Sequence, residues 1–329
     1  MKSPENLKID LAPGQKGMIQ LKLPENWQKF DVLRIKATDQ YGRVLNTWSW
    51  PVKYPEAKTK ELLTETSKEQ PTIQETEKEL IVKTNKLNFT FGKSDGTIQQ
   101  IKNGDKLIPL SNGPLFVTGE RKIKQSTHRF EDNVLVIETV FENNDMLKWT
   151  VQGNGLIDLE VNYEPTNNCL FAGITFDYPE KSVAGMKWLG NGPYRVYKNR
   201  MKGVEFGLWE KAYNNTITGE SGYIYPEFKG YHSEVYWAKI EGKDSPDFKV
   251  YIHSKDIFLR MLTPANQVAP AKTKIEYPKG DISFLHGINA IGTKFTEASS
   301  SGPQSNPYQF NSNKIHGGKL NMKITFDFR

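Results

Sequence analysis

The stretch KLNFTFGKSDGTIQQIKNGDKLI, residues 86–108, decides the fold class. Apolar and polar side chains alternate from Leu87 to Phe91, which is the period of a strand with one buried face. The dipeptides Asp-Gly at 95–96 and Asn-Gly at 103–104 favour the tight turns of β-hairpins. The stretch therefore predicts consecutive short strands that are joined by hairpin turns.

The same pattern recurs along most of the chain, and few segments carry the 3.6-residue period of a helix. Further segments of this kind are residues 133–142, 146–165, 170–179, 232–242, 247–254 and 319–328. We therefore predict an all-β protein in which residues 80–329 form one large β-sandwich of two sheets.

Residues 1–55 predict a smaller β unit. We expect two short strands at 7–11 and 18–23, on either side of a turn at Pro13 and Gly14, and then a strand pair within 30–52. A complete immunoglobulin-like sandwich needs about seven strands and about 100 residues. We therefore predict the C-terminal part of an immunoglobulin-like β-sandwich, with an apolar face and strand edges left exposed.

The segment between these two parts is predicted to be a linker, residues 56–79. It is rich in Lys, Glu and Thr and has few aliphatic residues. An exposed tether is favoured over the alternative of a short helix around residues 58–67.

Composition limits the partners of the protein. The chain has 44 Lys and Arg residues against 38 Asp and Glu residues, which gives a net charge of +6, and the basic residues are scattered. Nucleic-acid binding would need clustered basic charge, so we expect no nucleic-acid partner. We also expect no membrane partner, because no stretch approaches the roughly 18 apolar residues of a membrane span and the first residues lack the apolar core of a signal peptide.

The sequence carries no recognisable set of catalytic or metal-binding residues. The aromatic and basic window MKWLGNGPYRVYKNRMKGVEFGLW, residues 186–209, lacks the spacing of a phosphate-binding loop. The single cysteine, Cys169, lies in an apolar run and is expected to be a buried thiol. We predict no catalytic residue, no metal ligand and no cofactor. A structural cation is left open, because carboxylates such as Asp177, Asp244 and Asp247 do not follow the spacing of a known loop.

The window 186–209 nevertheless resembles a hallmark of one enzyme family. The pattern W-x-G-x-G-P-x-x-x-Y-x-x-R is formed by Trp188, Gly190, Gly192, Pro193, Tyr197 and Arg200. It resembles the C-terminal domain of glycoside hydrolase family 2 β-galactosidases. The segments 223–240 and 282–305 resemble later parts of that domain, and residues 11–24 resemble the immunoglobulin-like domain that precedes it.

The resemblance implies a non-catalytic role. In this family two glutamates on a (β/α)8 barrel cleave the glycosidic bond, and the β-rich pattern of this chain offers no such barrel. The C-terminal domain of the family is a supersandwich of the galactose-mutarotase type, which helps to shape the carbohydrate cleft or the assembly. The implied partners are a β-galactoside-type carbohydrate and the catalytic barrel domain of the parent enzyme, and a homo-oligomer is left open. The localisation would follow the parent enzyme: periplasmic or extracellular if it is exported, and otherwise cytoplasmic.

The carbohydrate-contacting candidates lie around this window and in the later segments. They are Tyr194, Arg195, Arg200, Glu227, His232, His286, Asn289 and Phe295. The family usually has Glu and Asp where this chain has Arg195 and Asn199. Trp188 and Tyr197 are expected to pack in the core, and Gly190 and Gly192 are interpreted as turn residues.

Two other functions stay open at this point. A mutarotase-like aldose epimerase would need a histidine acid and a glutamate base, such as His232 with Glu227 or Glu234, or His286 with Glu297. A stand-alone carbohydrate-binding module would need an exposed aromatic platform.

Overall fold

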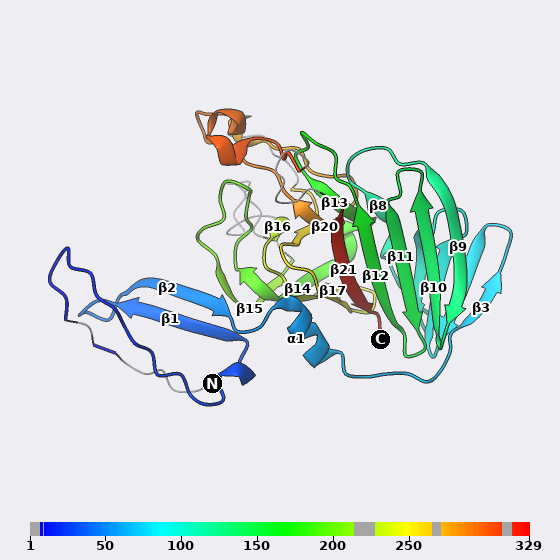
Figure 1. Cartoon of the computed structure of the whole chain (residues 1–329), viewed down its shortest axis with the longest axis horizontal. Coiled ribbons are helices and arrows are strands. Elements are labelled where there is room, and N and C mark those ends of the chain that lie inside the picture. The colour runs from blue at the N-terminus through cyan, green and yellow to red at the C-terminus, as the bar shows by residue number, and fades with distance from the viewer. Residues whose placement is uncertain (1–6, 9, 214–227, 265–270, 311–317) are drawn as a thin grey trace.

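The computed structural model describes residues 7–8, 10–213, 228–264, 271–310 and 318–329. Two large antiparallel sheets dominate this part of the chain, and a separate two-stranded hairpin extends from one side (Figure 1). The nine-stranded sheet has, in spatial order, β15 (Glu205–Ala212), β14 (Val183–Gly192), β17 (Trp237–Gly242), β18 (Phe248–Ile252), β21 (Leu320–Asp327), β12 (Leu156–Tyr163), β11 (Met146–Gln152), β10 (Val134–Phe141) and β9 (Ile123–Glu131).

The ten-stranded sheet covers one face of the first. It has, in spatial order, β16 (Gly230–His232), β19 (Phe258–Met261), β20 (Ile282–Gly287), β13 (Ala172–Asp177), β8 (Ser111–Phe116), β6 (Ile98–Asn103), β5 (Leu87–Gly92), β4 (Glu79–Thr84) and β3 (Thr72–Glu75), and β7 (Lys106–Ile108) pairs with β6. Short 3-10 turns lie at Trp27–Lys29, Glu180–Ser182, Ala271–Thr273, Ala298–Ser300 and Pro303–Ser305.

Aromatic side chains from both sheets form the centre of the core. Trp149 of β11 and Phe326 of β21, from the nine-stranded sheet, contact Phe176 of β13 across the sandwich, with ring centres 6.3 and 5.6 Å from it. The indole N–H of Trp149 donates a hydrogen bond of 2.9 Å to the carbonyl of Gly96, so this buried polar group is satisfied. The all-β class and the large two-sheet sandwich are thus confirmed.

The hairpins predicted in residues 86–108 are present as β5, β6 and β7. Gly96 and Gly104 adopt φ angles of +66° and +58°, a region that glycine enters without steric cost. The turn dipeptides therefore lie where the sequence places them.

The N-terminal part is only partly as predicted. β1 (Val32–Thr38) and β2 (Val44–Pro51) form the second predicted strand pair, and the turn at Pro13 and Gly14 is present. The strands predicted at 7–11 and 18–23 are wrong, since the described residues there form no strand. An alternating pattern favours a strand only where a neighbouring backbone offers ladder hydrogen bonds, and β1 and β2 pair only with each other.

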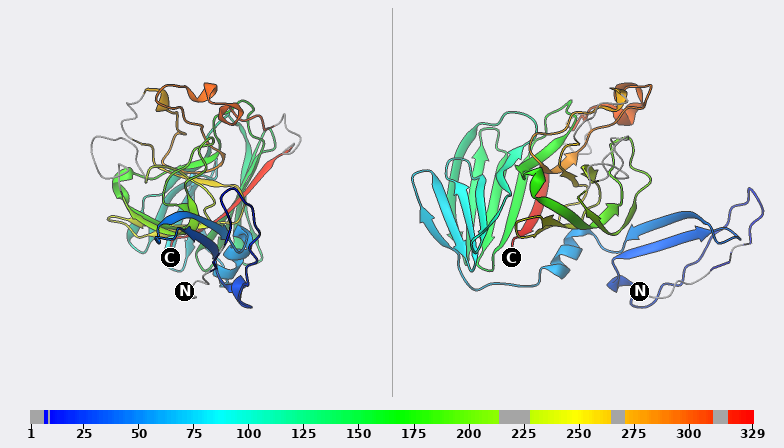
Figure 2. Two further views of the ribbon diagram at one scale, coloured as in Figure 1. Left: turned by 90° about the vertical axis from the view of Figure 1, so that its left-hand side faces the viewer. Right: turned by 180° about the vertical axis from the view of Figure 1, so that it is seen from behind.

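One face of the β1–β2 hairpin rests on the sandwich. The Ser49 hydroxyl accepts a hydrogen bond of 2.6 Å from the backbone N–H of Phe206 on β15, and Arg34 lies 3.9 Å from Glu205. The Tyr236 hydroxyl donates to the carbonyl of Lys53 at 2.8 Å. The hairpin is therefore fixed beside β15 (Figure 2).

The segment after the hairpin is not a tether throughout. It begins with α1 (Pro55–Leu62), whose Lys58 ammonium forms ion pairs with Asp31 at 2.5 Å and with Glu61 at 3.4 Å. None of the helices in the described part of the chain is long and apolar enough to cross a membrane.

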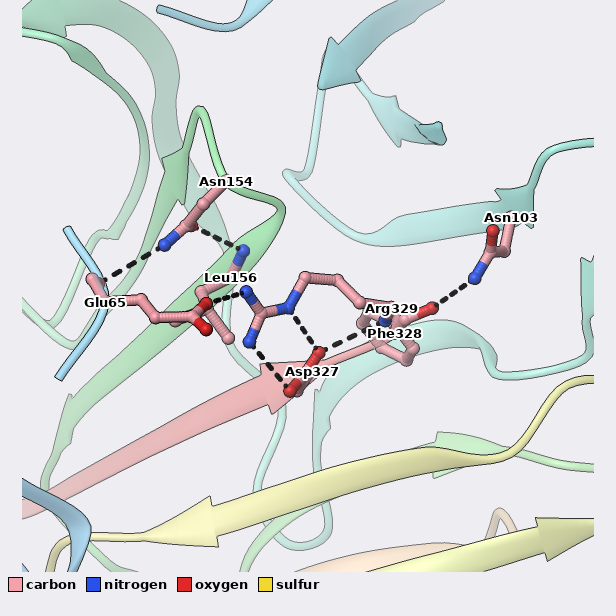
Figure 3. A network of polar contacts seen from close by, with 7 residues as sticks. All are labelled: Glu65, Asn103, Asn154, Leu156, Asp327, Phe328 and Arg329. Carbon is pink, nitrogen blue, oxygen red and sulfur yellow. Dashed lines mark hydrogen bonds and ion pairs between the residues drawn. The ribbon is translucent and has the colours of Figure 1, made fainter. Parts of the chain in front are cut away.

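Residues after α1 are held against the end of the sandwich (Figure 3). The guanidinium of Arg329 contacts the Glu65 carboxylate at 2.5 Å, and the Asn154 amide donates to the Glu65 carbonyl at 3.4 Å. A Cβ on Gly153 would lie 1.9 Å from the carbonyl oxygen of Glu69, so the two backbones approach closely. We call residues 63–71 the strap. The boundaries 1–55, 56–79 and 80–329 stay predictions.

Candidate functional site

The window 186–209 and the later segments meet at one end of the sandwich. The backbone N–H of Val196 donates to the carbonyl of Tyr231 at 2.8 Å, and that of Lys198 donates to the carbonyl of Asn289 at 2.9 Å. The Arg200 guanidinium donates to the carbonyl of Gly292 at 2.8 Å. We call these segments, residues 193–204, 228–232, 273–277 and 288–306, the loop cluster.

Asn199 ties two of these segments together. Its side-chain oxygen accepts from the backbone N–H of Ile291 at 3.0 Å, and its amide donates to the Ile291 carbonyl and to the Ser305 hydroxyl, both at 2.9 Å. An amide provides both donor and acceptor groups, whereas a carboxylate provides only acceptors. The asparagine that replaces the usual acid of the family therefore acts here as a brace for the backbone.

Tyr194 and Arg195 lie at the rim of the loop cluster. Tyr194 is 51% exposed, and the Lys211 ammonium lies 5.6 Å from its ring centre. Burial lowers the pKa of Lys211. Arg195 is half-buried, with its guanidinium 5.3 Å from the ring centre of Tyr197 and 3.4 Å from the carbonyl of Lys229.

The residues after Arg195 do not alternate as a strand would. Val196 and Tyr197 are both buried, and Tyr197 pairs with Arg200 across a tight turn. This segment forms only isolated bridges and is not a regular strand. Trp188 and Tyr197 do pack in the core, as predicted.

Asn289 is a buried brace. It is 3% exposed, accepts from the Tyr231 hydroxyl at 3.0 Å and donates to the carbonyl of Glu276 at 2.7 Å. Tyr231 in turn stacks on Tyr277, with ring centres 5.2 Å apart. No sequence motif indicated that Tyr231, Tyr277 or Lys211 belongs to the cluster. Tyr231 could have been found from its place after Gly230 in the segment that resembles the family.

His232 is fully buried, with no exposed surface, and its ring lies 5.2 Å from that of Trp188. Its Nε2–H donates to the carbonyl of Phe228 at 3.1 Å, and within the described residues Nδ1 has no hydrogen-bond partner. Burial, together with the nearby cations Lys211 and Arg195, lowers the pKa of His232 to about 4. The ring is therefore neutral at pH 7 and has no solvent-accessible surface.

His286 lies outside the hydrogen-bond network of the loop cluster. Its Nδ1 lies 3.0 Å from the Tyr163 hydroxyl, and its Nε2–H donates to the carbonyl of Asn321 at 3.2 Å. Glu297 pairs instead with Lys272 at 3.5 Å. The structure therefore does not bring His286 and Glu297 together.

Phe295 and Glu227 complete the candidates. Phe295 is 79% exposed on the late loop, the most exposed aromatic side chain in the described residues. Glu227 lies outside the described residues. Cys169 is buried as predicted, and burial raises the pKa of its thiol. The described residues contain no group of three or more side chains that could hold a metal ion.

Gly190 and Gly192 have a different role from the one predicted. Both lie within β14 rather than in a turn. A Cβ on Gly190 would lie 2.9 Å from the backbone of Glu234 and Val235, and one on Gly192 would lie 2.7 Å from the ring of Trp209. Close packing in the sheet therefore requires these glycines.

The fold and the loop cluster define a large antiparallel β-sandwich with a braced loop surface at one end. The sequence profile of the family described as "Beta galactosidase small chain" matches residues 83–263, more than half of the chain. The chain belongs to this family, which confirms the resemblance to β-galactosidases.

Comparison with solved structures finds distant matches. They include a proposed mutarotase (YeaD) from Salmonella typhimurium, with 10% identity and a TM-score of 0.38 over 83% of this chain and 100% of that chain. A proposed aldose 1-epimerase from Escherichia coli K12 matches with 10% identity and a TM-score of 0.32 over 78% of this chain and 98% of that chain. No curated protein matches the sequence.

Proposed function

We propose that this chain is a non-catalytic part of a β-galactosidase-type glycoside hydrolase of family 2. In this proposal a barrel region on a partner carries the two catalytic carboxylates, and this chain helps to shape the carbohydrate cleft. Retaining glycosidases need two carboxyl groups about 5–5.5 Å apart on either side of the scissile bond. Membership in the small-chain family supports the type of enzyme.

The chemistry of the loop cluster supports a non-catalytic role. Three polar side chains of the cluster are hydrogen-bonded to backbone carbonyls: those of Asn199, Arg200 and Asn289. His232 is buried and neutral. Among the predicted carbohydrate-contacting residues, Tyr194 and Phe295 are exposed aromatic side chains. Aromatic rings can contact the apolar face of a sugar and do no acid–base work in that contact.

The observation that carries the proposal is the uncovered face of the β1–β2 hairpin. Cross-strand pairs Leu33–Trp50 and Ile35–Trp48 lie on the face opposite to Arg34 and Ser49. Trp48 and Trp50 are 44% and 45% exposed.

A two-stranded hairpin is marginally stable in water, and an exposed apolar sheet face is typical of an interface. We therefore assign this face to the partner that carries the barrel. Residues 1–55 would then form part of an immunoglobulin-like sandwich, and strands of the partner would complete that sandwich.

The test is co-purification from the organism of origin. The material that co-purifies with the tagged chain should hydrolyse o-nitrophenyl β-galactoside. It should contain a barrel-bearing polypeptide, which mass spectrometry identifies. The double variant Trp48→Ser/Trp50→Ser should lose this activity. Tyr41→Ser is the matched control, because Tyr41 is 74% exposed in the hairpin turn and does not lie on the apolar face. Equal activity with the double variant and with the wild type would contradict the proposal.

A further inference from the structure

The helix α1 joins the β1–β2 hairpin to the strap and lies against β18 of the nine-stranded sheet (Figure 1). Pro55 and Thr59, which are one turn apart on α1, are both buried. A helix of eight residues is marginal by itself in water, so packing on the sheet stabilises it. The contacts beneath α1 therefore decide how firmly this joint is held.

A histidine lies close to α1 on the outer face of the sheet. His253 follows β18, its ring is half-buried, and its Nε2 lies 2.7 Å from the hydroxyl of Thr325 on β21. That hydroxyl donates its one proton to the carboxylate of Asp158 on β12. It can therefore only accept from His253, so Nε2 of the ring carries a proton. Thr325 is 1% exposed, so this chain of hydrogen bonds is covered.

Charged groups from three elements face the ring of His253. They are Asp158 of β12, Lys323 of β21, and Glu56 and Lys60 of α1, which pair with each other at 2.7 Å. Two carboxylates and two ammonium groups thus surround the ring, and their charges balance only while the ring is neutral. Burial lowers the pKa of His253, which also favours the neutral ring.

We propose that His253 is a pH-sensitive anchor of α1. At neutral pH the uncharged ring donates to Thr325, and the helix is held on the sheet. At lower pH a second ring proton adds a third cation beside Lys60 and Lys323 in a partly buried place, which disfavours the docked helix. α1 then detaches while the sandwich stays folded, and the joint between the hairpin and the strap loosens.

The direction follows from linkage. The pKa of an exposed histidine is about 6.5 and that of the docked ring is lower, so docking is strongest above pH 6.5 and weakens as the pH falls below it. The inference goes beyond the proposed function, because it concerns the chain alone and needs no partner.

The first experiment is amide hydrogen exchange of the purified chain at pH 7 and pH 5, expressed as protection factors. From pH 7 to pH 5 the protection of residues 58–63 should fall by a factor of about three or more relative to that of β12. His253→Gln keeps a donor for Thr325 and takes up no proton, so its α1 should be equally protected at both pH values. His128→Gln is the matched control, because His128 lies on β9, pairs with Glu75 and should leave the wild-type response unchanged. Thermal melting at pH 7 checks that the variants are folded.

The second experiment is an NMR titration of the His253 ring. If docking favours the neutral ring, breaking α1 must raise the pKa of His253 toward 6.5. Thr59→Pro places a proline inside α1 and should have this effect. Lys68→Pro is its control, because Lys68 is an exposed strap residue outside the helix, and it should leave the pKa of His253 unchanged.

Three results would overturn the inference: no loss of α1 protection at pH 5 in the wild type, an equal loss in His253→Gln, or a pKa of His253 that is the same in Thr59→Pro and the wild type. None of these measurements uses the partner or the exposed face with Trp48 and Trp50. Failure of this inference is therefore distinguishable from failure of the proposed function.

Discussion

The guanidinium of Arg329 lies 2.5 Å from the carboxylate of Glu65, which precedes it by 264 positions in the chain. The same guanidinium bonds to Asp327, at the end of β21, at 2.8 and 3.1 Å. Arg329 therefore connects the strap to a central strand of the nine-stranded sheet (Figure 3). This contact and the Asn154 amide, which donates to the Glu65 carbonyl, hold the strap against the sandwich.

Replacing Arg329 should release the strap with little effect on global stability. Glu65 is 69% exposed and Arg329 is 33% exposed at the side chain, and such surface pairs contribute about 0–1 kcal/mol. Arg329→Ala should therefore leave the free energy of unfolding nearly unchanged and accelerate amide hydrogen exchange in residues 63–71. Arg129→Ala, which removes another exposed arginine pair, should not accelerate exchange there. Unchanged exchange in Arg329→Ala would show that the contact does not hold the strap.

Trp188 should be a stability residue, whereas Tyr194 should not. Trp188 has no exposed surface, and its indole N–H donates to the Asn191 carbonyl at 3.0 Å. Trp188→Ala should lower the free energy of unfolding, measured by urea denaturation, by about 3–5 kcal/mol, the scale for deleting a buried aromatic side chain. Tyr194→Ala should change the free energy of unfolding by no more than about 0.5 kcal/mol, as at other exposed positions. Arg195→Ala should lower the free energy of unfolding by about 1 kcal/mol, because its half-buried guanidinium packs on Tyr197. Similar costs for Trp188→Ala and Tyr194→Ala would contradict this packing.

The glycines of β14 should tolerate substitution according to their neighbours. In Gly190→Ala the new methyl group would meet the backbone at 2.9 Å, and backbone cannot move aside cheaply. We expect a loss of about 1–3 kcal/mol, the usual cost of overpacking. Gly207→Ala on neighbouring β15 is the control, because the one contact of its methyl group below 3.4 Å would be the flexible end of Arg34, at 3.0 Å. Denaturation curves that show equal stability for the two variants would contradict the packing argument.

The sandwich could be predicted because its signal is local. Alternation from Leu87 to Phe91 and the turns at Gly96 and Gly104 specify strands and hairpins without knowledge of distant residues. The prediction of strands at 7–11 and 18–23 was wrong because a strand also needs a neighbouring strand to pair with. A short alternating pattern does not show whether such a neighbour exists. The contacts of the strap could not be predicted for a related reason. Arg329, which binds Glu65 of the strap, lies at the other end of the sequence.

The sequence names the segments of the candidate site but does not predict how their side chains bond. The segments around Arg200 and Asn289 meet in the structure, through backbone hydrogen bonds and the Arg200 side chain. The bonding of Asn199 to Ile291 and the burial of His232 depend on loop geometry, which a residue pattern does not encode. Isolated histidines are therefore the least predictable part of such a site.

Stability should fall as the pH falls from neutrality, because His232 must stay neutral in the folded protein. The pKa of His232 is about 4 in the folded protein, against 6.5 for the unperturbed group. Between these two pH values the unfolded chain therefore binds a proton at His232 that the folded chain does not bind. The stabilisation is complete above pH 6.5 and is lost progressively down to about pH 4, up to about 3 kcal/mol in total. Urea denaturation at a series of pH values measures this slope.

His232→Gln is the control for that slope, because it removes the titrating group. The variant should be less stable at neutral pH, and it should lose less stability between pH 6.5 and pH 4 than the wild type does. Burial also lowers the pKa of His253, and that contribution is common to both proteins. Parallel pH profiles in the two proteins would show that His232 does not carry the effect.

Hydrolysis of o-nitrophenyl β-galactoside by the purified chain alone tests whether this chain is catalytic. If this chain shapes a β-galactosidase without supplying its catalytic carboxylates, the rate should equal that of the buffer blank, and activity should appear only in the complex with the barrel-bearing partner. Turnover that persists through purification and disappears when an Asp or Glu of this chain is replaced would contradict the account.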